Sequence, residues 1–200
     1  MSTGTVQVPD HLAGVCGPPS FFSLPAPLVL DLGCGNGVFL SALAAGDSSL
    51  NFLGVEKKEY RVRQAQRRCG GLANARILAG EVSEVLRMLP PRSVTRAYLL
   101  FSDPWPKRRH AVRRVVQEDF IALLRSRLIA GGGFFFASDC AAYCQWARAM
   151  FTASGFWRVA AWAPAQDWPR TEFEQHFTTA GIPVSRFCAT PVRQLPHASD

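Results

Sequence analysis

The chain has 200 residues, 48% of them hydrophobic, and its 22 basic and 15 acidic residues give a net charge of +7. This length and apolar content suffice for one sizeable core, so we expect a single domain. The positive charge favours an anionic partner, of which nucleic acid is the commonest. The six cysteines form no CxxC pair and have no zinc-like spacing with the four histidines, so we expect reduced thiols and no metal site.

The beginning of the chain has no basic region followed by an apolar core, and the richest apolar stretch, residues 128–137, is interrupted by three glycines. Neither pattern is that of a signal peptide or a membrane span. We therefore expect a cytoplasmic protein that does not contact a membrane. A monomer and a homodimer both stay open.

Residues 1–26 are rich in Gly, Pro and Ser and have no periodicity, which predicts an N-terminal tail or arm. Phe21 and Phe22 either pin the end of this arm to the core or pack locally. One domain is predicted over residues 27–190, and residues 191–200 are predicted to form a C-terminal tail.

Within this domain, apolar runs typical of strands alternate with helical patterns. Strands are predicted at 28–32, 51–55, 75–79, 96–101, 134–137, 157–162 and 184–189. Helices are predicted at about 38–45, 57–69, 115–129 and 141–153, with the glycine triplet 131–133 ending the third of them. The alternation predicts an α/β protein with a Rossmann-like, doubly wound, mostly parallel seven-stranded sheet and helices on both faces.

A glycine-rich segment, Asp31-Leu32-Gly33-Cys34-Gly35-Asn36-Gly37, ends the first predicted strand and opens the first helix. Glycines there let a ligand approach the backbone, in the crevice where open α/β sheets bind ligands. The spacing is acidic-x-GxGxG and not the GxGxxG of dinucleotide sites. Because Asp31 repels a pyrophosphate but tolerates an amino group or a sulfonium, the pattern favours S-adenosylmethionine, bound by Asp31, Gly33, Gly35 and Gly37.

Two further carboxylates follow the next two strands. Glu56 stands at the end of the second strand, where it is placed to accept hydrogen bonds from both ribose hydroxyls, and Glu81 follows the third strand, where it can hold the adenine amino group. The alternative is a glycine turn that binds no ligand. We expect Cys34 to be a small packing residue and not a nucleophile.

A carboxylate and a dense basic patch follow the fourth predicted strand. Asp103 stands in the turn Asp103-Pro104-Trp105-Pro106, and Lys107, Arg108, Arg109, Arg113 and Arg114 come within the next eleven positions. The end of this strand faces the same crevice as the glycine loop. The cations either bind a polyanion or form a solvated charged face, and Trp105 either stacks on an extruded base or packs inside the turn.

This segment resembles the signature of the bacterial tRNA (guanine-N7-)-methyltransferase family, in the residues Asp103-Pro104-Trp105-Pro106-Lys107 followed by Arg109-His110 and Arg113-Arg114. Other matches occur in the family's order: the acidic-Leu-Gly-x-Gly-x-Gly loop, Gly54-Val55-Glu56, Asn74, Ser138-Asp139 with Tyr143 and Trp146, and Thr171-Glu172-Phe173-Glu174. The resemblance covers roughly residues 28–190. It departs from the family at Ser102, where proline is usual, and at Ala111 and Val112, which replace polar or basic residues.

The resemblance implies methyl transfer from S-adenosylmethionine to N7 of a guanine in the variable loop of tRNA. It implies that Asp31, Glu56 and Glu81 bind the cofactor and that Asp103 is the catalytic residue. Substrate binding is implied for Lys107, Asp139, Thr171 and Glu174, and RNA binding for Arg108, Arg109, His110, Arg113 and Arg114.

Thr171 and Glu174 also fit a helix capping box, and the second predicted helix, with its six cations, fits a solvated face. Two other functions stay open: a non-catalytic RNA-binding relative, and a methyltransferase that acts on another RNA guanine.

Overall fold

The computed structural model describes residues 21–22 and 26–192. Most of the predicted N-terminal arm and residues 193–200 of the predicted C-terminal tail lie outside these ranges. The sheet has seven strands: β1 (Leu28–Leu32), β2 (Asn51–Glu56), β3 (Ala75–Ala79), β4 (Val94–Leu100), β5 (Leu128–Ser138), β6 (Trp157–Ala160) and β7 (Ser185–Pro191). The helices are α1 (Val38–Gly46), α2 (Glu59–Cys69), α3 (Val82–Met88), the 3-10 helix η3 (Arg108–Arg113), α4 (Glu118–Arg127), α5 (Ala141–Ala153) and α6 (Glu172–Thr179).

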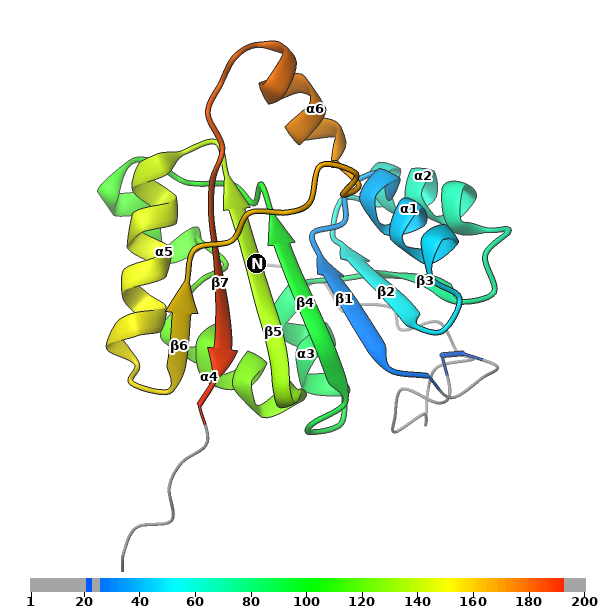
Figure 1. Ribbon diagram of the computed structural model, residues 1–200, viewed down its shortest axis with the longest axis horizontal. Helices are drawn as coiled ribbons and strands as arrows, with labels where there is room; N and C mark the ends of the chain where they lie inside the picture. Colours follow the sequence, from blue (N-terminus) through cyan, green and yellow to red (C-terminus); the bar gives the residue numbers. More distant parts are fainter. Residues whose placement is uncertain (1–20, 23–25, 193–200) are drawn as a thin grey trace, which may run out of the picture.

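The strand order in the sheet is β3-β2-β1-β4-β5-β7-β6 (Figure 1). The first five strands run parallel, and β7 is antiparallel to both β5 and β6. This arrangement confirms the predicted α/β fold with its mostly parallel seven-stranded sheet. None of the helices in the described ranges is long and apolar enough to cross a membrane.

The two faces of the sheet bury separate apolar clusters. Alternate residues of each central strand point to opposite faces, so that Leu28, Leu30 and Leu32 of β1 pack with α3, α4 and α5. Val29 of β1 belongs to the other cluster, with α1 and α2. Every residue of β1 is buried because both faces are covered, as expected for a central parallel strand.

The end of the N-terminal arm packs into the first of these clusters. Phe21 and Phe22 are 8% and 5% exposed, and the guanidinium of Arg76 lies 5.6 Å from the ring centre of Phe22. Of the two expectations for this pair, the structure supports the one that pins the arm to the core.

The predicted boundary between the third helix and the fifth strand is wrong. α4 ends at Arg127, the backbone of Leu128 is extended, and Leu128 already pairs with Val94 of β4. The glycine triplet lies inside β5, where the pairing with β4 shifts register. A side chain at Gly132 would stand 3.1 Å from the Thr95 carbonyl oxygen, a tight contact that favours glycine at this irregularity of the strand, and the triplet does not end a helix.

Three helices were not predicted, α3, the 3-10 helix η3 and α6, and α2 begins at Glu59, two residues after the predicted start. α3 has only seven residues, too few for a clear helical period. α6 carries the capping pair that the sequence indicated, but its buried face contains little apolar surface.

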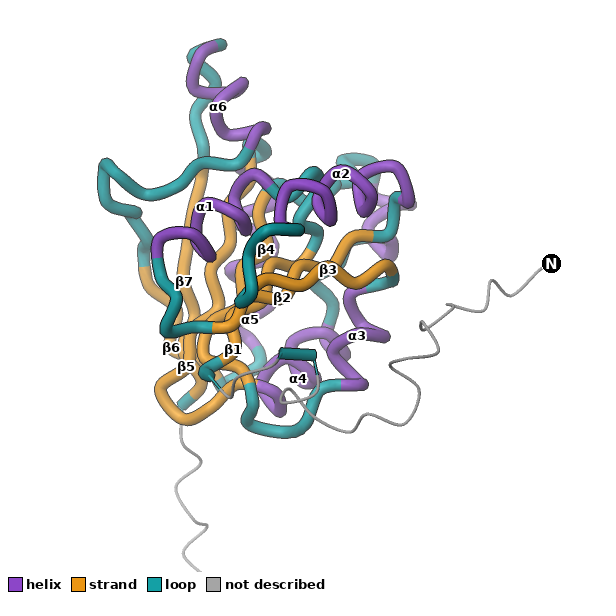
Figure 2. Tube along the Cα trace, turned by 90° about the vertical axis from the view of Figure 1, so that its right-hand side faces the viewer, coloured by secondary structure: helices purple, strands orange, loops and turns teal. Residues whose placement is uncertain are grey.

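The sheet topology places the functional site. The chain order reverses between β1 and β4, and ligands bind in the crevice outside the carboxyl ends of such neighbouring strands. α6 stands above this edge of the sheet, in the connection between β6 and β7, and Figure 2 shows it projecting beyond the body of the domain.

Candidate active site

The glycine loop after β1 combines an open approach with tight packing. Gly33, Gly35 and Gly37 all have positive φ, at 82°, 56° and 77°. A Cβ at Gly33 would meet nothing within 4 Å, whereas a Cβ at Gly37 would stand 2.9 Å from the Cα of Ala65 on α2. Gly33 therefore leaves room above the backbone, and Gly37 allows α1 and α2 to pack closely.

Glu56 closes this loop from the end of β2. Its side chain is buried, and its two oxygens accept hydrogen bonds from the Gly35 amide at 3.1 Å and the Lys58 amide at 2.8 Å. A carboxylate oxygen has two lone pairs, so each oxygen keeps acceptor capacity for a ligand. The carboxylate is thus fixed in position and still able to bind hydroxyl groups.

Asp31 lies below the loop and is 3% exposed. Burial, with a smaller contribution from the negative charge of Glu56, raises the pKa of Asp31 to about 7. Burial, followed by the negative charges of Asp31 and Glu56, raises the pKa of the Cys34 thiol well above its usual value. Cys34 is buried and stays protonated at neutral pH, as expected for a packing residue.

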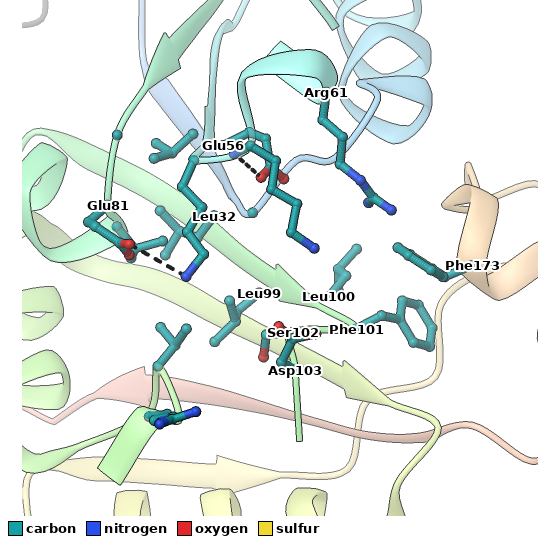
Figure 3. Close-up of a pocket in the computed structure, with 18 of the residues that line it drawn as sticks. Leu32, Glu56, Arg61, Glu81, Leu99, Leu100, Phe101, Ser102, Asp103 and Phe173 are labelled. Atoms are coloured by element: carbon teal, nitrogen blue, oxygen red, sulfur yellow. Dashed lines mark hydrogen bonds and ion pairs between the residues drawn. The ribbon is translucent and has the colours of Figure 1, made fainter. Parts of the chain in front are cut away.

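One cleft brings together residues from four strand ends: Gly33, Glu56, Glu81 and Asp103 (Figure 3). Its cavity volume is about 150 Å³, and it opens to solvent. Glu81 is exposed, and one of its oxygens lies 3.4 Å from the Lys57 ammonium. The predicted meeting of Asp103 with the glycine loop is confirmed.

Asp103 stands in a strained turn. Phe101 and Trp105, on either side of it, have φ values of 57° and 41°, which residues with a side chain rarely adopt. The Ser102 hydroxyl lies 3.4 Å from the Tyr143 hydroxyl on α5. Backbone strain of this kind persists where the surroundings enforce it, as they do at functional sites.

The ring of Trp105 has neighbours on the η3 side of the turn. The guanidinium of Arg113 lies 4.9 Å from the ring centre, and His110 meets the ring edge-on at 5.7 Å. Trp105 lines the cleft and is partly exposed. It combines packing with access to a ligand, so both expectations for this ring stay open.

α6 overhangs the cleft and begins with the predicted cap. The Thr171 hydroxyl accepts a hydrogen bond from the Glu174 amide at 3.0 Å, which confirms the capping interaction. The side-chain amide of Asn36 in the glycine loop donates to Glu172 at 2.8 Å. Thr171 also lines a small side cleft together with Asp31 and Gly35.

Several predicted site residues lie outside the main cleft. Within the described ranges, the lining of this cleft does not include Lys107, Asp139 or Glu174. Glu174 is buried and pairs with Arg186 of β7, while Lys107 and Arg109 are exposed on and before η3. Asp139 follows β5, beside the strand that carries Asp103.

The cleft also contains residues for which the sequence predicted no role in binding. Arg61 of α2 and Phe173 of α6 both line the cleft, with the guanidinium 5.0 Å from the ring centre (Figure 3). Arg61 is one of six cations on and before α2, so the pattern gives no reason to single it out. Asn74, in contrast, is structural: its side-chain nitrogen lies within 3.1 Å of the carbonyl oxygens of Ala44, Asp47 and Leu50.

A doubly wound sheet with an acid-led glycine loop fits a methyltransferase, and residues 25–187 match a family described as "Putative methyltransferase". The chain is 34% identical over 176 residues to the tRNA (guanine-N(7)-)-methyltransferase of Saccharophagus degradans, covering 84% of this chain and 77% of the relative. It is 38% identical over 144 residues to that of Halorhodospira halophila, covering 70% of this chain and 62% of the relative. The chain belongs to the tRNA (guanine-N(7)-)-methyltransferase family.

Solved structures share the fold at low sequence identity. An O-methyltransferase from Thermotoga maritima, described as SAM-dependent, superposes with a TM-score of 0.60 at 19% identity and covers 88% of this chain and 64% of its own. A precorrin-6y C5,15-methyltransferase from Geobacter metallireducens gives 0.59 at 13% identity, covering 85% and 82%. These similarities concern the fold alone.

Proposed function

We propose that this chain transfers a methyl group from S-adenosylmethionine to N7 of a guanine in the variable loop of tRNA. The observation that carries the proposal is the position of Asp103, in one cleft with Gly33 and Glu56. The relatives named above are tRNA (guanine-N(7)-)-methyltransferases, which supports the choice of tRNA and of the guanine N7 atom.

The cofactor side of the cleft fits S-adenosylmethionine. Gly33 leaves the backbone open to a ligand, and Glu56 keeps acceptor capacity for two hydroxyl groups of a ribose. Asp31, which lines the small side cleft below the loop, offers a buried carboxylate to a cationic amino group, and Glu81 offers an exposed one to the adenine edge. When bound, S-adenosylmethionine supplies an electrophilic methyl group on a sulfonium.

The substrate side of the cleft needs alignment more than proton transfer. Guanine N7 carries a lone pair and no proton, so no general base is required, and the ring becomes cationic as it is methylated. Asp103 accepts hydrogen bonds from the Watson–Crick edge of guanine and offsets the developing positive charge. Thr171, Glu174, Lys107 and Asp139 are proposed to hold the nucleotide around it.

The cations beside the turn are proposed to meet the phosphate backbone. Arg109 and Arg113 are exposed and His110 is partly exposed, all on η3. Arg108, whose side chain lies outside the described part of the structure, belongs to the same proposed surface. Phosphate contacts of this kind give an affinity that falls steeply with salt concentration.

The proposal is tested by methylation of purified tRNA, with N7-methylguanine mapped by chemical cleavage at the modified base. Wild-type protein is expected to modify one guanine in the variable loop. Asp103→Ala and Asp103→Asn are expected to lower kcat by about 100-fold or more, the scale of a lost electrostatic contact to the transition state. Asp119→Asn, an exposed acid on α4, serves as the matched control.

The other functions predict different outcomes. Binding of tRNA without cofactor binding or turnover identifies a non-catalytic relative, and modification outside the variable loop identifies another guanine. Near-normal turnover by both Asp103 variants rejects the role given to this carboxylate.

A further inference from the structure

Arg113 and Arg114 are neighbours in the chain but lie in different surroundings. Arg113 is exposed, lines the main cleft and packs over Trp105. Arg114 is half-buried and, within the described ranges, is absent from the lining of that cleft. The basic run therefore contains two kinds of arginine.

The guanidinium of Arg114 is engaged with the turn that carries Asp103. Its Nε donates a hydrogen bond to the Pro104 carbonyl oxygen at 2.9 Å, and one terminal nitrogen donates to the Trp105 carbonyl oxygen at 3.2 Å. Two consecutive carbonyls are thus bridged by one planar group. Such a bridge needs the fixed fork of donors that only arginine has.

α5 supports the same guanidinium from its other side. The central carbon of Arg114 lies 4.6 Å from the ring centre of Trp146 and 5.2 Å from that of Tyr143. The hydroxyl of Tyr143 in turn lies 3.4 Å from the Ser102 hydroxyl. Arg114, which packs on α5, and Tyr143, which belongs to α5, therefore hold the segments after and before Asp103.

The turn needs this support because of its backbone. Trp105, whose carbonyl Arg114 binds, has a φ of 41°, and Phe101 has a φ of 57°. A bulky side chain at such values relaxes toward ordinary conformations unless its neighbours prevent it. Relaxation at either residue displaces the carboxylate of Asp103 between them.

We infer that Arg114 is a positioning residue that fixes the Asp103 turn, and that it is not one of the phosphate contacts. The inference rests on the proposed function, because it concerns the residue proposed to hold guanine. Arg114 acts through backbone carbonyls and aromatic rings, so its shape matters as well as its charge. Lysine keeps the charge but cannot form the planar bridge.

The test compares Arg114→Lys and Arg114→Ala with wild type by two measurements. The first is hydrogen exchange, in the free protein, of two hydrogen-bonded amides that flank the turn: that of Phe101, which donates to the Ala137 carbonyl oxygen at 2.8 Å, and that of His110, which donates to the Lys107 carbonyl oxygen at 2.8 Å. The second is steady-state methylation of tRNA between about 50 and about 200 mM salt, which separates kcat, KM and the salt dependence. Arg125→Lys is the matched control, because its guanidinium packs 4.5 Å from the ring centre of Phe156 on the far side of the domain.

Both Arg114 variants are expected to exchange these amides at least about tenfold faster and to lower kcat at least about tenfold. KM for tRNA and its salt dependence are expected to stay at the wild-type values. Arg125→Lys is expected to change neither measurement. If the alanine variant does not fold, the lysine variant decides alone.

If Arg114→Lys keeps the wild-type amide protection and the wild-type kcat, the inference is overturned, because a positive charge alone is then enough to hold the turn. A raised KM with a shallower salt dependence at unchanged kcat also overturns it and returns Arg114 to the RNA contacts. The exchange measurement needs no activity, so if the wild type methylates no tRNA, the proposed function fails and amide protection still decides the role of Arg114.

Discussion

The carboxylate of Glu56 accepts a hydrogen bond from the Gly35 amide at 3.1 Å, which ties the end of β2 to the glycine loop after β1. Its other oxygen accepts from the Lys58 amide, so the side chain links three segments of the cofactor side of the cleft. The position of the loop therefore depends on a side chain that is proposed to bind the ribose.

Replacing Glu56 with glutamine is expected to weaken both the hydrogen bonding that holds the glycine loop and the binding of the cofactor. The amide group of glutamine turns an N–H donor toward one of the two backbone donors, which leaves a buried amide unpaired at a cost of about 1–3 kcal/mol of folding stability. Affinity for S-adenosylmethionine, measured by calorimetry, is expected to fall at least about tenfold. Glu59→Gln, at an exposed position that pairs with Arg63, is the control and keeps wild-type affinity.

Asp31 gives the protein a pH-dependent stability. Its pKa is about 7 in the folded chain against 3.8 unfolded, so the folded state binds the proton more tightly. This contribution is fully present below about pH 4 and is lost as the pH rises to about 7, in total about 4 kcal/mol. Asp31→Asn, which stays neutral, is expected to remove this part of the pH dependence in urea unfolding between about pH 4 and about pH 8. Parallel curves for the two proteins contradict the prediction.

The same carboxylate makes cofactor binding a proton-linked event. A cationic amino group beside Asp31 favours its ionised form and lowers its pKa. Binding of S-adenosylmethionine at about pH 6.5 is therefore expected to release part of a proton in wild type and none from this site in Asp31→Asn. Calorimetry in buffers of different ionisation enthalpy measures the release, and equal values in both proteins place the amino group elsewhere.

Two glycines of the loop separate packing from ligand access. Gly37→Ala puts a methyl group 2.9 Å from Ala65 at a positive φ, and is expected to destabilise the fold by about 2–5 kcal/mol. Gly33→Ala meets open space and costs only the strain of its φ, about 1–2 kcal/mol. Cofactor affinity is expected to fall in Gly33→Ala, because the added methyl group occupies the ligand's approach. Unfolding curves and calorimetry on the two variants give both quantities.

Arg113 is expected to behave as a phosphate contact. In Arg113→Gln, tRNA affinity falls and the slope of log affinity against log salt becomes shallower by about one. Filter binding over a salt series measures the slope. Arg125→Gln carries the same loss of charge on the far side of the domain and is expected to keep the wild-type slope, so an equal change in both variants indicates a general effect of net charge.

The sequence predicted that Glu56 and Asp103 meet near the glycine loop, because these residues stand at strand ends. Asp31, Glu56 and Asp103 each follow a run of apolar residues, and the parallel topology then places all three at one edge of the sheet. The order and direction of the strands are enough to predict that these residues lie near one another.

The parts that were missed depend on contacts between segments distant in sequence. Leu128 continues the apolar period of α4, and only its pairing with Val94 shows that it is already in a strand. The separate roles of Arg113 and Arg114 are set by Trp105 and by α5, which no local pattern of charges contains. In the cleft, the guanidinium of Arg61 packs on the ring of Phe173, which comes more than a hundred residues later in the chain.

The connection that carries α6 leaves the sheet at Ala160 and returns at Ser185, and its two flanking strands are hydrogen-bonded to each other through the pair Ala160 and Cys188. Its ends are therefore held side by side whatever lies between them. Changes of length in this excursion are therefore expected to leave the pairing of β6 with β7 intact. The groups proposed to recognise the nucleotide here, Thr171 and Glu174, lie in this one excursion, whereas the groups proposed to bind the methyl donor lie at or just after the ends of β1, β2 and β3. The hydrogen bond from Asn36 to Glu172 joins the two stretches, so a change in the excursion is felt at the glycine loop.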